Sequence, residues 1–490
     1  MARLASACLL LAALSLLGPS EPSYDPWAWL VWGRELGHLT LDTTGGPSWK
    51  PLPVVFTTLF GPLSAVDDRI PPALWIVVAR AGGLLALVLA FRVAARVAGG
   101  GLLRRTIAGG VAALALALSP EWIRYLIHGN EAPLAVGLGL LALDRHLEGR
   151  RKAAFLAGAV ACLARPELFG FVLLYGAYLC VRSPRSRTLV GVSVVIVIAA
   201  WLVPSWIGSG DPLYAGTQAR SEPSWSLSLA PVPWRAALHV AQSQAWLVLE
   251  LAAVAAVVLA AFAVRGRRRW PPGPAQPTAV AALAGFAGAN VVLYCGMTEA
   301  GFSGNARYVL PALAAIAVLG GVGAALLVEA AGRLSAAGRL VAAAALLAGA
   351  APELATHVGV ARSEGREAIE RSALHAELAR AVDSVGARYT TLFGPATVNR
   401  SYQTHLAWEL SLPVSDVHGA RGRGISFSSS ADVAGPVRIL RRARPRATIV
   451  RVGSWTVTER LPNARHVFTW PVQGFSLRAA AARYSAAARS

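Results

Sequence analysis

The sequence predicts an all-α polytopic membrane protein of about 11 transmembrane helices, with a C-terminal extracytoplasmic α/β domain. The chain of 490 residues is 55% hydrophobic and has a mean hydropathy of +0.50. Long apolar segments also recur along the chain as far as about residue 355. A membrane-spanning helix needs about 20 mainly apolar residues, and soluble domains are rarely so apolar over such a length. An ordinary soluble fold is therefore excluded.

Eleven hydrophobic segments are expected to form helices. They are residues 4–19, 71–97, 104–119, 131–147, 153–164, 167–181, 188–208, 242–264, 278–296, 307–331 and 339–355. The first is compatible with a signal peptide, but the absence of an A-x-A pattern before Tyr24 favours an uncleaved helix. The short segments 153–164 and 167–181 meet at Arg165-Pro166-Glu167, so we expect them to enter the membrane and return with their turn on the outer side.

The formal net charge of +20 follows the expected topology. Five loops and the N-terminus carry almost only arginine and lysine, with Asp144 and Glu148 as their acids. The loops are 92–105, 144–152, 182–187, 265–269 and 332–339. Because basic residues collect in short cytoplasmic loops, we expect a multi-pass protein of the cell (plasma) membrane with a cytoplasmic N-terminus. The odd number of spans then places the C-terminus outside, and the charge predicts no nucleic-acid partner.

The chain is predicted to divide into a transmembrane domain, residues 1–355, and a soluble outer-face domain, residues 356–490. The first outer loop, 20–70, contains two short helical patterns that we expect to lie in the membrane interface, with tryptophans at headgroup level. The C-terminal region is polar and arginine-rich. It combines a helical pattern over 367–385 with β-like runs at 389–393 and 448–453.

Four short patterns with charged residues fall on the expected outer side. Tyr24-Asp25 follows the first segment, and Trp49-Lys50-Pro51-Leu52 lies in the same loop. His128-Gly129-Asn130-Glu131-Ala132-Pro133-Leu134 leads into the fourth segment, and Arg307-Tyr308-Val309-Leu310-Pro311 opens the tenth. Since each belongs to a different part of the chain but to one side of the membrane, we expect the chemistry to lie at this boundary.

In this order the patterns resemble the GT-C superfamily of polyprenyl-phosphate-sugar-dependent glycosyltransferases, especially its protein-mannosyltransferase and aminoarabinose-transferase branch. That branch has an acidic pair after its first helix, a K-P-P-L-like motif, an acid opening the fourth helix, a T-K-G-P turn and R-Y-x-x-P. Here the pair is the single acid of Asp25-Pro26, the second proline is displaced to Pro53, and the later acid is Glu131. The layout also resembles actinobacterial cell-envelope transferases.

The resemblance implies an inverting transferase that moves a sugar from a polyprenyl-phosphate donor to an envelope glycan, lipid or protein. Asp25 is the predicted general base, because an acceptor hydroxyl must lose a proton. Lys50 and Arg307 are predicted to bind the donor phosphate, whose negative charge requires fixed cations. Glu131 is a second catalytic candidate that could position the acceptor, orient Lys50 or hold a metal. The predicted substrate-binding residues are Tyr24, Trp49, His128 and Tyr308.

Other interpretations remain open at this point. Asp25 is also a good helix cap before Pro26, and Lys50 could snorkel to the interface. A transporter or flippase of a lipid-linked sugar, or a non-catalytic envelope assembly protein, would share the same composition. The four cysteines show no paired spacing, so neither a disulfide framework nor a zinc site is predicted. No cofactor is required by the sequence, and a divalent cation remains open.

Overall fold

The computed structural model describes residues 2–221, 225–264, 275–387, 390, 395–419, 424–430 and 446–460. The chain forms two compact units. The first consists of Met1–Ala373 with Pro413–Ser415, and the second of Leu374–Leu412 with Asp416–Ser490. Helix α16 (Ala336–Val385) contributes residues to both units, and residue 355 lies within this helix.

Each of the eleven predicted hydrophobic segments overlaps a helix of the first unit. In chain order, these are α1 (Ala2–Leu14), α4 (Ile70–Ala98), α5 (Leu102–Ala117), α7 (Ala132–Leu147), α8 (Arg151–Cys162), α9 (Phe169–Arg182), α10 (Arg187–Ser209), α13 (Leu247–Val264), α14 (Pro277–Glu299), α15 (Leu310–Leu334) and α16. The mostly helical fold predicted from composition is confirmed.

The described residues contain fewer helices of spanning length than the eleven predicted. Six are long and apolar enough to cross a membrane, or seven if α5 and α6 (Pro120–Ile127), which meet at a 63° bend, form one span. Helices α1, α7, α8 and α9 have 13, 16, 12 and 14 residues. They are short of the roughly 20 residues that a span needs. Hydropathy locates an apolar run but does not fix where the helix ends.

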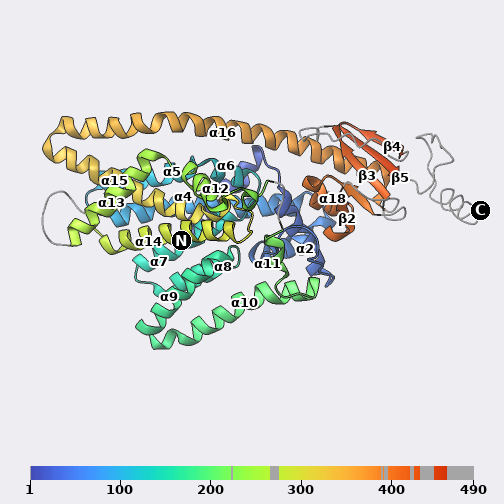
Figure 1. Cartoon of the computed structure of the whole chain (residues 1–490), viewed down its shortest axis with the longest axis horizontal. Coiled ribbons are helices and arrows are strands. Elements are labelled where there is room, and N and C mark those ends of the chain that lie inside the picture. The colour runs from blue at the N-terminus through green and yellow to red at the C-terminus, as the bar shows by residue number, and fades with distance from the viewer. Residues whose placement is uncertain are drawn as a thin grey trace, which may run out of the picture. The chain divides into compact units, whose positions relative to one another are not determined.

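Helix α15 forms the centre of the first unit, where it packs against α5, α13, α14 and α4 (Figure 1). Two glycines allow this close packing. A Cβ at Gly321 would collide with the carbonyl oxygen of Ala108 in α5, and one at Gly323 with that of Ala252 in α13. Small residues let helix backbones approach closely, as is common between helices in membranes.

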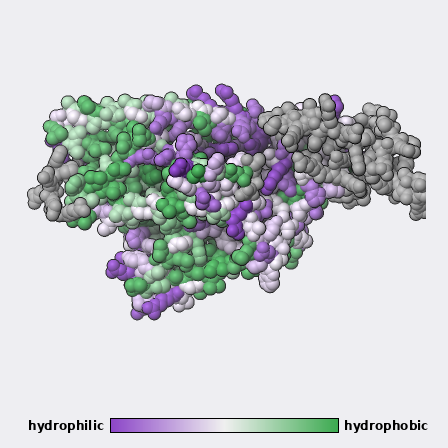
Figure 2. All heavy atoms as spheres, in the orientation of Figure 1, coloured by the Kyte–Doolittle hydropathy of each residue, from purple (hydrophilic) through white to green (hydrophobic). Residues whose placement is uncertain are grey.

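Large apolar side chains cover much of the outer surface of this unit. Figure 2 shows hydrophobic residues over α10, α13 and α14, and Val195, Val254 and Val292 on these helices are 65%, 60% and 72% exposed. Apolar surface of this extent is unusual on soluble monomers. It fits a multi-pass membrane protein whose helices face lipid.

The loop of residues 20–70, predicted to be the first outer loop, contains α2 (Tyr24–Gly37) and α3 (Pro51–Phe60). The expectation that its tryptophans lie at headgroup level is wrong for Trp27, Trp29 and Trp32, which are only 6%, 0% and 0% exposed. These indoles pack inside the protein, and Trp29 contacts Trp75 edge to face with ring centroids 5.3 Å apart. Helix α2 is therefore a core element, because other helices of the unit cover its apolar faces.

Short elements complete the first unit. They are η1 (Ser15–Leu17), η2 (Gly61–Ala65), η3 (Pro166–Leu168), η4 (Pro184–Ser186), α11 (Tyr214–Ala219), η5 (Leu227–Leu229), α12 (Pro233–Ser243), η6 (Ala306–Tyr308) and η8 (Val414–Asp416), the last shared with the second unit. Most connect longer helices, and η3 and η6 carry residues of the site described below.

The second unit contains a small mixed sheet with strand order β2-β1-β3-β5-β4. Strand β1 pairs in parallel with β2 and β3, whereas β3, β5 and β4 pair antiparallel. The other elements are η7 (Arg400–Tyr402) and α18 (Gln403–Glu409). The strands are β1 (Ala396–Val398), β2 (Val417–Gly419), β3 (Gly424–Ser429), β4 (Arg446–Val452) and β5 (Trp455–Arg460). The β-like run at 448–453 is confirmed by β4, while the run at 389–393 lies, apart from residue 390, outside the described residues.

Candidate functional site

The four charged patterns of the sequence meet at one place in the first unit, and each reaches it from the start of a helix. Asp25 lies in the first turn of α2, and Lys50 directly precedes α3. Glu131 directly precedes α7, and Arg307 lies in η6, just before α15. Helix N-termini present unpaired backbone N–H groups and a partial positive charge. The ends that meet here therefore favour a bound anion.

Backbone hydrogen bonds hold the loops of the site together. The N–H of Ser23, just before α2, donates to the carbonyl oxygen of His128 at 3.2 Å. The N–H of Leu52 in α3 donates to the carbonyl oxygen of Leu163 at 3.0 Å, close to the turn between α8 and α9. The loop of residues 20–70 is thus tied both to the segment before α7 and to this turn.

Lys50 lies at the centre of the site and is only 5% exposed. Its Nζ donates a hydrogen bond to Glu131 Oε1 and lies 3.9 Å from Asp25 Oδ2. The ammonium is also 5.3 Å from the centroid of the Trp29 ring, within the range of a cation–π contact. A buried ammonium held by two carboxylates and an indole has the surroundings of a fixed charge, which a snorkelling lysine would lack.

Arg307 forms the second half of the arrangement. Its Nη1 lies 2.5 Å from Asp25 Oδ2, and its guanidinium lies 5.8 Å from the centroid of the Tyr308 ring. The backbone N–H of Arg307 donates to Asn305 Oδ1 at 3.1 Å, and the same oxygen accepts from Tyr125 Oη at 2.6 Å. The asparagine cap thereby fixes the short helix from which Arg307 reaches Asp25.

Arg165 is a third cation in the site, and it was predicted only as part of a turn between two short segments. It is 2% exposed, and its Nη1 lies 3.2 Å from Glu131 Oε1. Its Nη2 lies 2.5 Å from Glu167 Oε1, and the guanidinium lies 4.6 Å from the Tyr308 ring centroid. The available signal was the charged turn Arg165-Pro166-Glu167 between two apolar segments, since charge at such a turn must be paired inside the protein.

The site contains equal numbers of opposite charges, and these shift the pKa values of Lys50 and Glu131. Burial lowers the pKa of Lys50 to about 8, with help from Arg307 and against the opposing effect of Glu131 and Asp25. Burial alone would raise the pKa of Glu131, but Lys50 and Arg165 outweigh it and lower that pKa to about 2. Glu131 is therefore a carboxylate at neutral pH, and Lys50 is protonated there and loses its proton in mildly alkaline solution. The three cations are Lys50, Arg165 and Arg307, and the three carboxylates are Asp25, Glu131 and Glu167.

Several buried polar atoms of the site make no hydrogen bond with the described residues, among them Glu167 Oε2. Glu131 Oε2 and Arg307 Nε are both buried, and neither makes a hydrogen bond with any residue that the structure describes. Leaving such atoms unpaired costs about 1–3 kcal/mol each. An unsatisfied acceptor and an unsatisfied donor in one charged cluster are suited to a polar ligand with both hydroxyl and phosphate groups.

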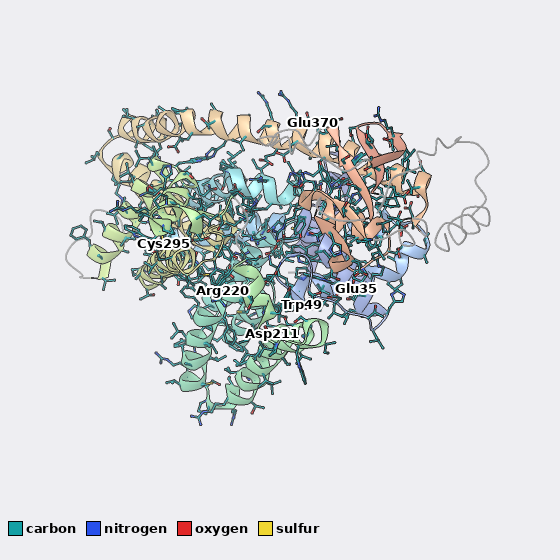
Figure 3. All side chains as sticks on the ribbon, turned by 45° about the vertical axis from the view of Figure 1, so that its right-hand side comes forward. Glu35, Trp49, Asp211, Arg220, Cys295 and Glu370 are labelled. Carbon is teal, nitrogen blue, oxygen red and sulfur yellow. The ribbon has the colours of Figure 1, made fainter. Side chains whose placement is uncertain are left out.

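The remaining predicted substrate-binding residues also lie around this cluster. Trp49, labelled in Figure 3, is 3% exposed and donates from Nε1 to the carbonyl oxygen of Ala200 at 3.1 Å. His128 Nδ1 lies 3.0 Å from the carbonyl oxygen of Glu21. Tyr24 begins α2 and is half-buried. Trp49 and His128 use ring nitrogens to hold the fold, and their binding of substrate stays a prediction.

The residues of the site do not fit a metal ion. Across the described parts of the chain, no three His, Cys, Asp or Glu side chains lie close enough together to hold one. Asp25 is paired with Arg307, and Glu131 with Lys50 and Arg165. A divalent cation would have to displace these cations or sit beside them, so no chemical step is assigned to a metal.

Comparison with solved structures shows which known fold the chain shares. The crystal structure of ArnT from Cupriavidus metallidurans in the apo state matches with a TM-score of 0.52 and 16% identity, over 93% of this chain and 97% of ArnT. A second ArnT structure from the same organism, bound to undecaprenyl phosphate, matches with a TM-score of 0.49 and 14% identity over the same shares of the two chains. No protein-family profile and no curated protein sequence matches the chain. The chain therefore has an ArnT-like fold, shown by the apo structure.

Proposed function

We propose that the protein is an integral-membrane inverting glycosyltransferase that moves a sugar from a polyprenyl-phosphate donor to an acceptor hydroxyl. The observation that carries this proposal is the position of one carboxylate, Asp25, between Arg307 at 2.5 Å and Lys50 at 3.9 Å. Displacement of a sugar from a lipid phosphate requires a base for the acceptor hydroxyl and cations for the departing phosphate, and here the charged atoms of two cations lie within 4 Å of one carboxylate oxygen of the base, Asp25. The ArnT-like fold adds support, because ArnT is a GT-C polyprenyl-phosphate-sugar glycosyltransferase.

Lys50 and Arg307 are assigned to the donor phosphate. Arginine binds phosphate through two parallel N–H donors, whereas lysine acts as a compact charge. Arg307 Nε makes no hydrogen bond with the described residues and is ready to donate one. The phosphate oxygens compete with Asp25 for the guanidinium, so donor binding releases the carboxylate from its strongest partner.

Asp25 is assigned the role of general base. As the acceptor hydroxyl attacks the anomeric carbon, its proton passes to the carboxylate of Asp25. A bond forms between the acceptor oxygen and the anomeric carbon, while the bond from that carbon to the phosphate oxygen breaks. The electron pair leaves with the polyprenyl phosphate, where Lys50 and Arg307 stabilise the charge. One such displacement inverts the configuration of the sugar.

Glu131 and Arg165 are assigned to positioning. Glu131 Oε1 holds Lys50 and Arg165, while Oε2 has no protein hydrogen bond in the described structure and can accept one from a sugar hydroxyl. Arg165 links Glu131 to Glu167 and to the face of Tyr308. Removing either residue is thus expected to disturb the orientation of Lys50 and Tyr308 together.

The proposal includes the predicted topology. Residues 1–355 form the transmembrane catalytic domain, and residues 356–490 a domain on the extracytoplasmic face. The acceptor is a glycan, lipid or protein of the cell envelope. The basic loops support this orientation. Along the chain they alternate with the loops that carry Asp25, Glu131 and Arg307, so the two sets of loops fall on opposite sides of the membrane, and basic loops are typically cytoplasmic.

The test is transfer from a panel of radiolabelled polyprenyl-phosphate sugars in membranes that contain wild type or Asp25→Asn. Transfer by wild type and its loss in the variant would establish the class and name the donor sugar. Label that crosses the membrane without leaving its lipid, equally in both proteins, would contradict the proposal and favour a flippase.

A further inference from the structure

A second charged cluster lies at the other end of α7, away from the site described above. Glu131 directly precedes this helix, whereas Asp144, Arg145 and Glu148 lie at its C-terminal end. An α-helix rises 1.5 Å per residue, so the two ends are about 20 Å apart. The cluster is therefore separate from the candidate site and, in the predicted topology, lies near the opposite boundary of the membrane.

The acids of the cluster are heavily paired. Asp144 has no exposed side-chain surface, and its carboxylate lies 2.5 Å from Arg145 Nη2, 3.0 Å from Arg96 Nη1 and 3.4 Å from Arg92 Nη2. Buried carboxylates need such partners. Asp144 therefore fixes three arginines, on α4 and α7, around one point.

Glu148 binds the same group of arginines, at 2.8 Å from Arg145 Nη1 and 3.2 Å from Arg92 Nη2. It also lies 3.8 Å from Arg150 Nε. Together with Arg96, four guanidinium groups face two carboxylates, so the cluster has an excess of two positive charges. The protein itself leaves this charge uncompensated within the cluster.

A cavity of about 570 Å³ opens beside the cluster. Its polar wall consists of Arg92, Arg145, Arg150 and the carboxylate Glu148, and its apolar wall includes Leu85, Leu141 and Ala153. The side chain of Arg145 is only 9% exposed, and its buried Nε has no hydrogen-bond partner among the described residues. The cavity thus combines an unsatisfied cationic donor with apolar surface.

We propose that this cavity binds the phosphate headgroup of an anionic phospholipid. Guanidinium groups are the preferred partners of phosphate, and basic pockets between transmembrane helices on the cytoplasmic side bind anionic lipid headgroups. Leu85 and Leu141 supply the apolar surface on which the first part of an acyl chain rests. The inference is independent of glycosyl transfer.

A purely topological role for these arginines does not account for the cavity. Cytoplasmic arginines that only set orientation need to be charged and near the surface. Arg185 in η4 meets that description, because it is exposed and forms no ion pair with a carboxylate in the part of the chain that the structure describes. Arg145 is instead buried against two acids, with one donor left over. A fixed guanidinium with a free N–H donor favours an anion bound at a defined position.

The experiment is a titration of the purified full chain in detergent with phosphatidylglycerol, phosphatidylcholine or inorganic phosphate, followed by native mass spectrometry and thermal unfolding. Wild type should bind phosphatidylglycerol in preference to phosphatidylcholine and unfold at a higher temperature when it is bound. The variant Arg92→Gln/Arg150→Gln should bind it about fivefold more weakly for each guanidinium removed. The matched control, Arg185→Gln, should bind like wild type.

Three results would overturn the proposal. One is equal binding of the two lipids, and another is an equal loss of binding in Arg185→Gln, which would indicate a diffuse basic surface. The third is full stabilisation by inorganic phosphate alone, which would indicate a site for a soluble anion. If the double variant does not fold, Arg150→Gln serves in its place, because this side chain is 68% exposed. It should then weaken lipid binding about fivefold without changing the unfolding temperature of the lipid-free protein.

Discussion

Arg307 Nη1 lies 2.5 Å from Asp25 Oδ2, so the proposed phosphate-binding group is paired with the proposed base. The two functions exclude one another while the ion pair persists. A donor phosphate that binds Arg307 weakens its hold on Asp25 and leaves the carboxylate free to accept a proton. The base would thus become available only when the donor is present.

Asp25→Asn should abolish transfer and at the same time tighten donor binding. Loss of a general base typically costs 10²–10⁴-fold in rate, while removal of the carboxylate leaves Arg307 without its competitor. Radiolabel transfer and equilibrium binding of undecaprenyl phosphate measure the two effects separately. Asp67→Asn, an exposed acid of the same outer loop, is the control. A parallel loss of binding would show that Asp25 serves the fold instead.

Donor affinity should fall above about pH 8. The free protein loses the Lys50 proton as pH rises through its lowered pKa of about 8, whereas the complex with phosphate retains it. Above this pH, formation of each complex takes up one proton, so the affinity for the donor declines by up to about tenfold per pH unit. Lys50→Arg keeps its charge in this range and should show a flat profile. The assignment fails if both proteins show the same decline.

Glu131→Gln should destabilise the protein by about 3 kcal/mol, because it leaves Lys50 and Arg165 buried beside a neutral group. Thermal unfolding in detergent measures the loss. The double variant Lys50→Met/Glu131→Leu removes both charges of one pair and should recover part of that stability. Unfolding of Glu131→Gln at the wild-type temperature would contradict a structural role for this carboxylate.

Arg165→Gln should weaken donor binding about tenfold, because the six-charge cluster then carries a net negative charge that repels phosphate. Arg165→Gln/Glu167→Gln restores the balance and should recover most of the affinity. Isothermal titration calorimetry with undecaprenyl phosphate measures the dissociation constants of the two variants and distinguishes them. If both bind equally weakly, Arg165 contacts the donor directly, and the charge-balance explanation is wrong.

Gly323→Ala should destabilise the helical unit, since a Cβ there collides with the backbone carbonyl of Ala252. Gly285→Ala in α14 is the matched control, because a Cβ at that position has open space around it. There the better helix propensity of alanine should stabilise the protein by at most about 1 kcal/mol. Comparison of the two unfolding temperatures tests whether α15 and α13 pack as described.

The positions of the long helices could be predicted from apolar runs. The expected segment 188–208 corresponds to α10 (Arg187–Ser209), and 278–296 to α14 (Pro277–Glu299). The end of the last helix could not be predicted in this way. Helix α16 continues to Val385 through a polar sequence, because helix formation does not require apolar residues.

Proximity of the charged patterns was expected because all four were predicted on one side of the membrane, and the structure brings Asp25, Lys50, Glu131 and Arg307 together. Their roles remain proposals. The turn Arg165-Pro166-Glu167 was recognised, but Arg165 was given no role in the site, because its ion pairs depend on three-dimensional partners that spacing does not reveal. The indoles of α2 were predicted to lie in the membrane interface because tryptophan is enriched there. Tertiary packing covers them instead. Only the fold determines whether a tryptophan lies in the membrane interface or in the protein core.

The pairing of Asp25 with Arg307 has a consequence for biogenesis. The two residues are 282 positions apart in sequence. At a synthesis rate of about 10 residues per second, Asp25 emerges from the ribosome about half a minute before its partner. During that interval Asp25 lacks its strongest counter-charge, whereas Lys50 and Glu131 can already pair with each other. We therefore expect nascent chains that stop before α15 to be recognised by membrane quality control, even though most of their hydrophobic helices are already inserted.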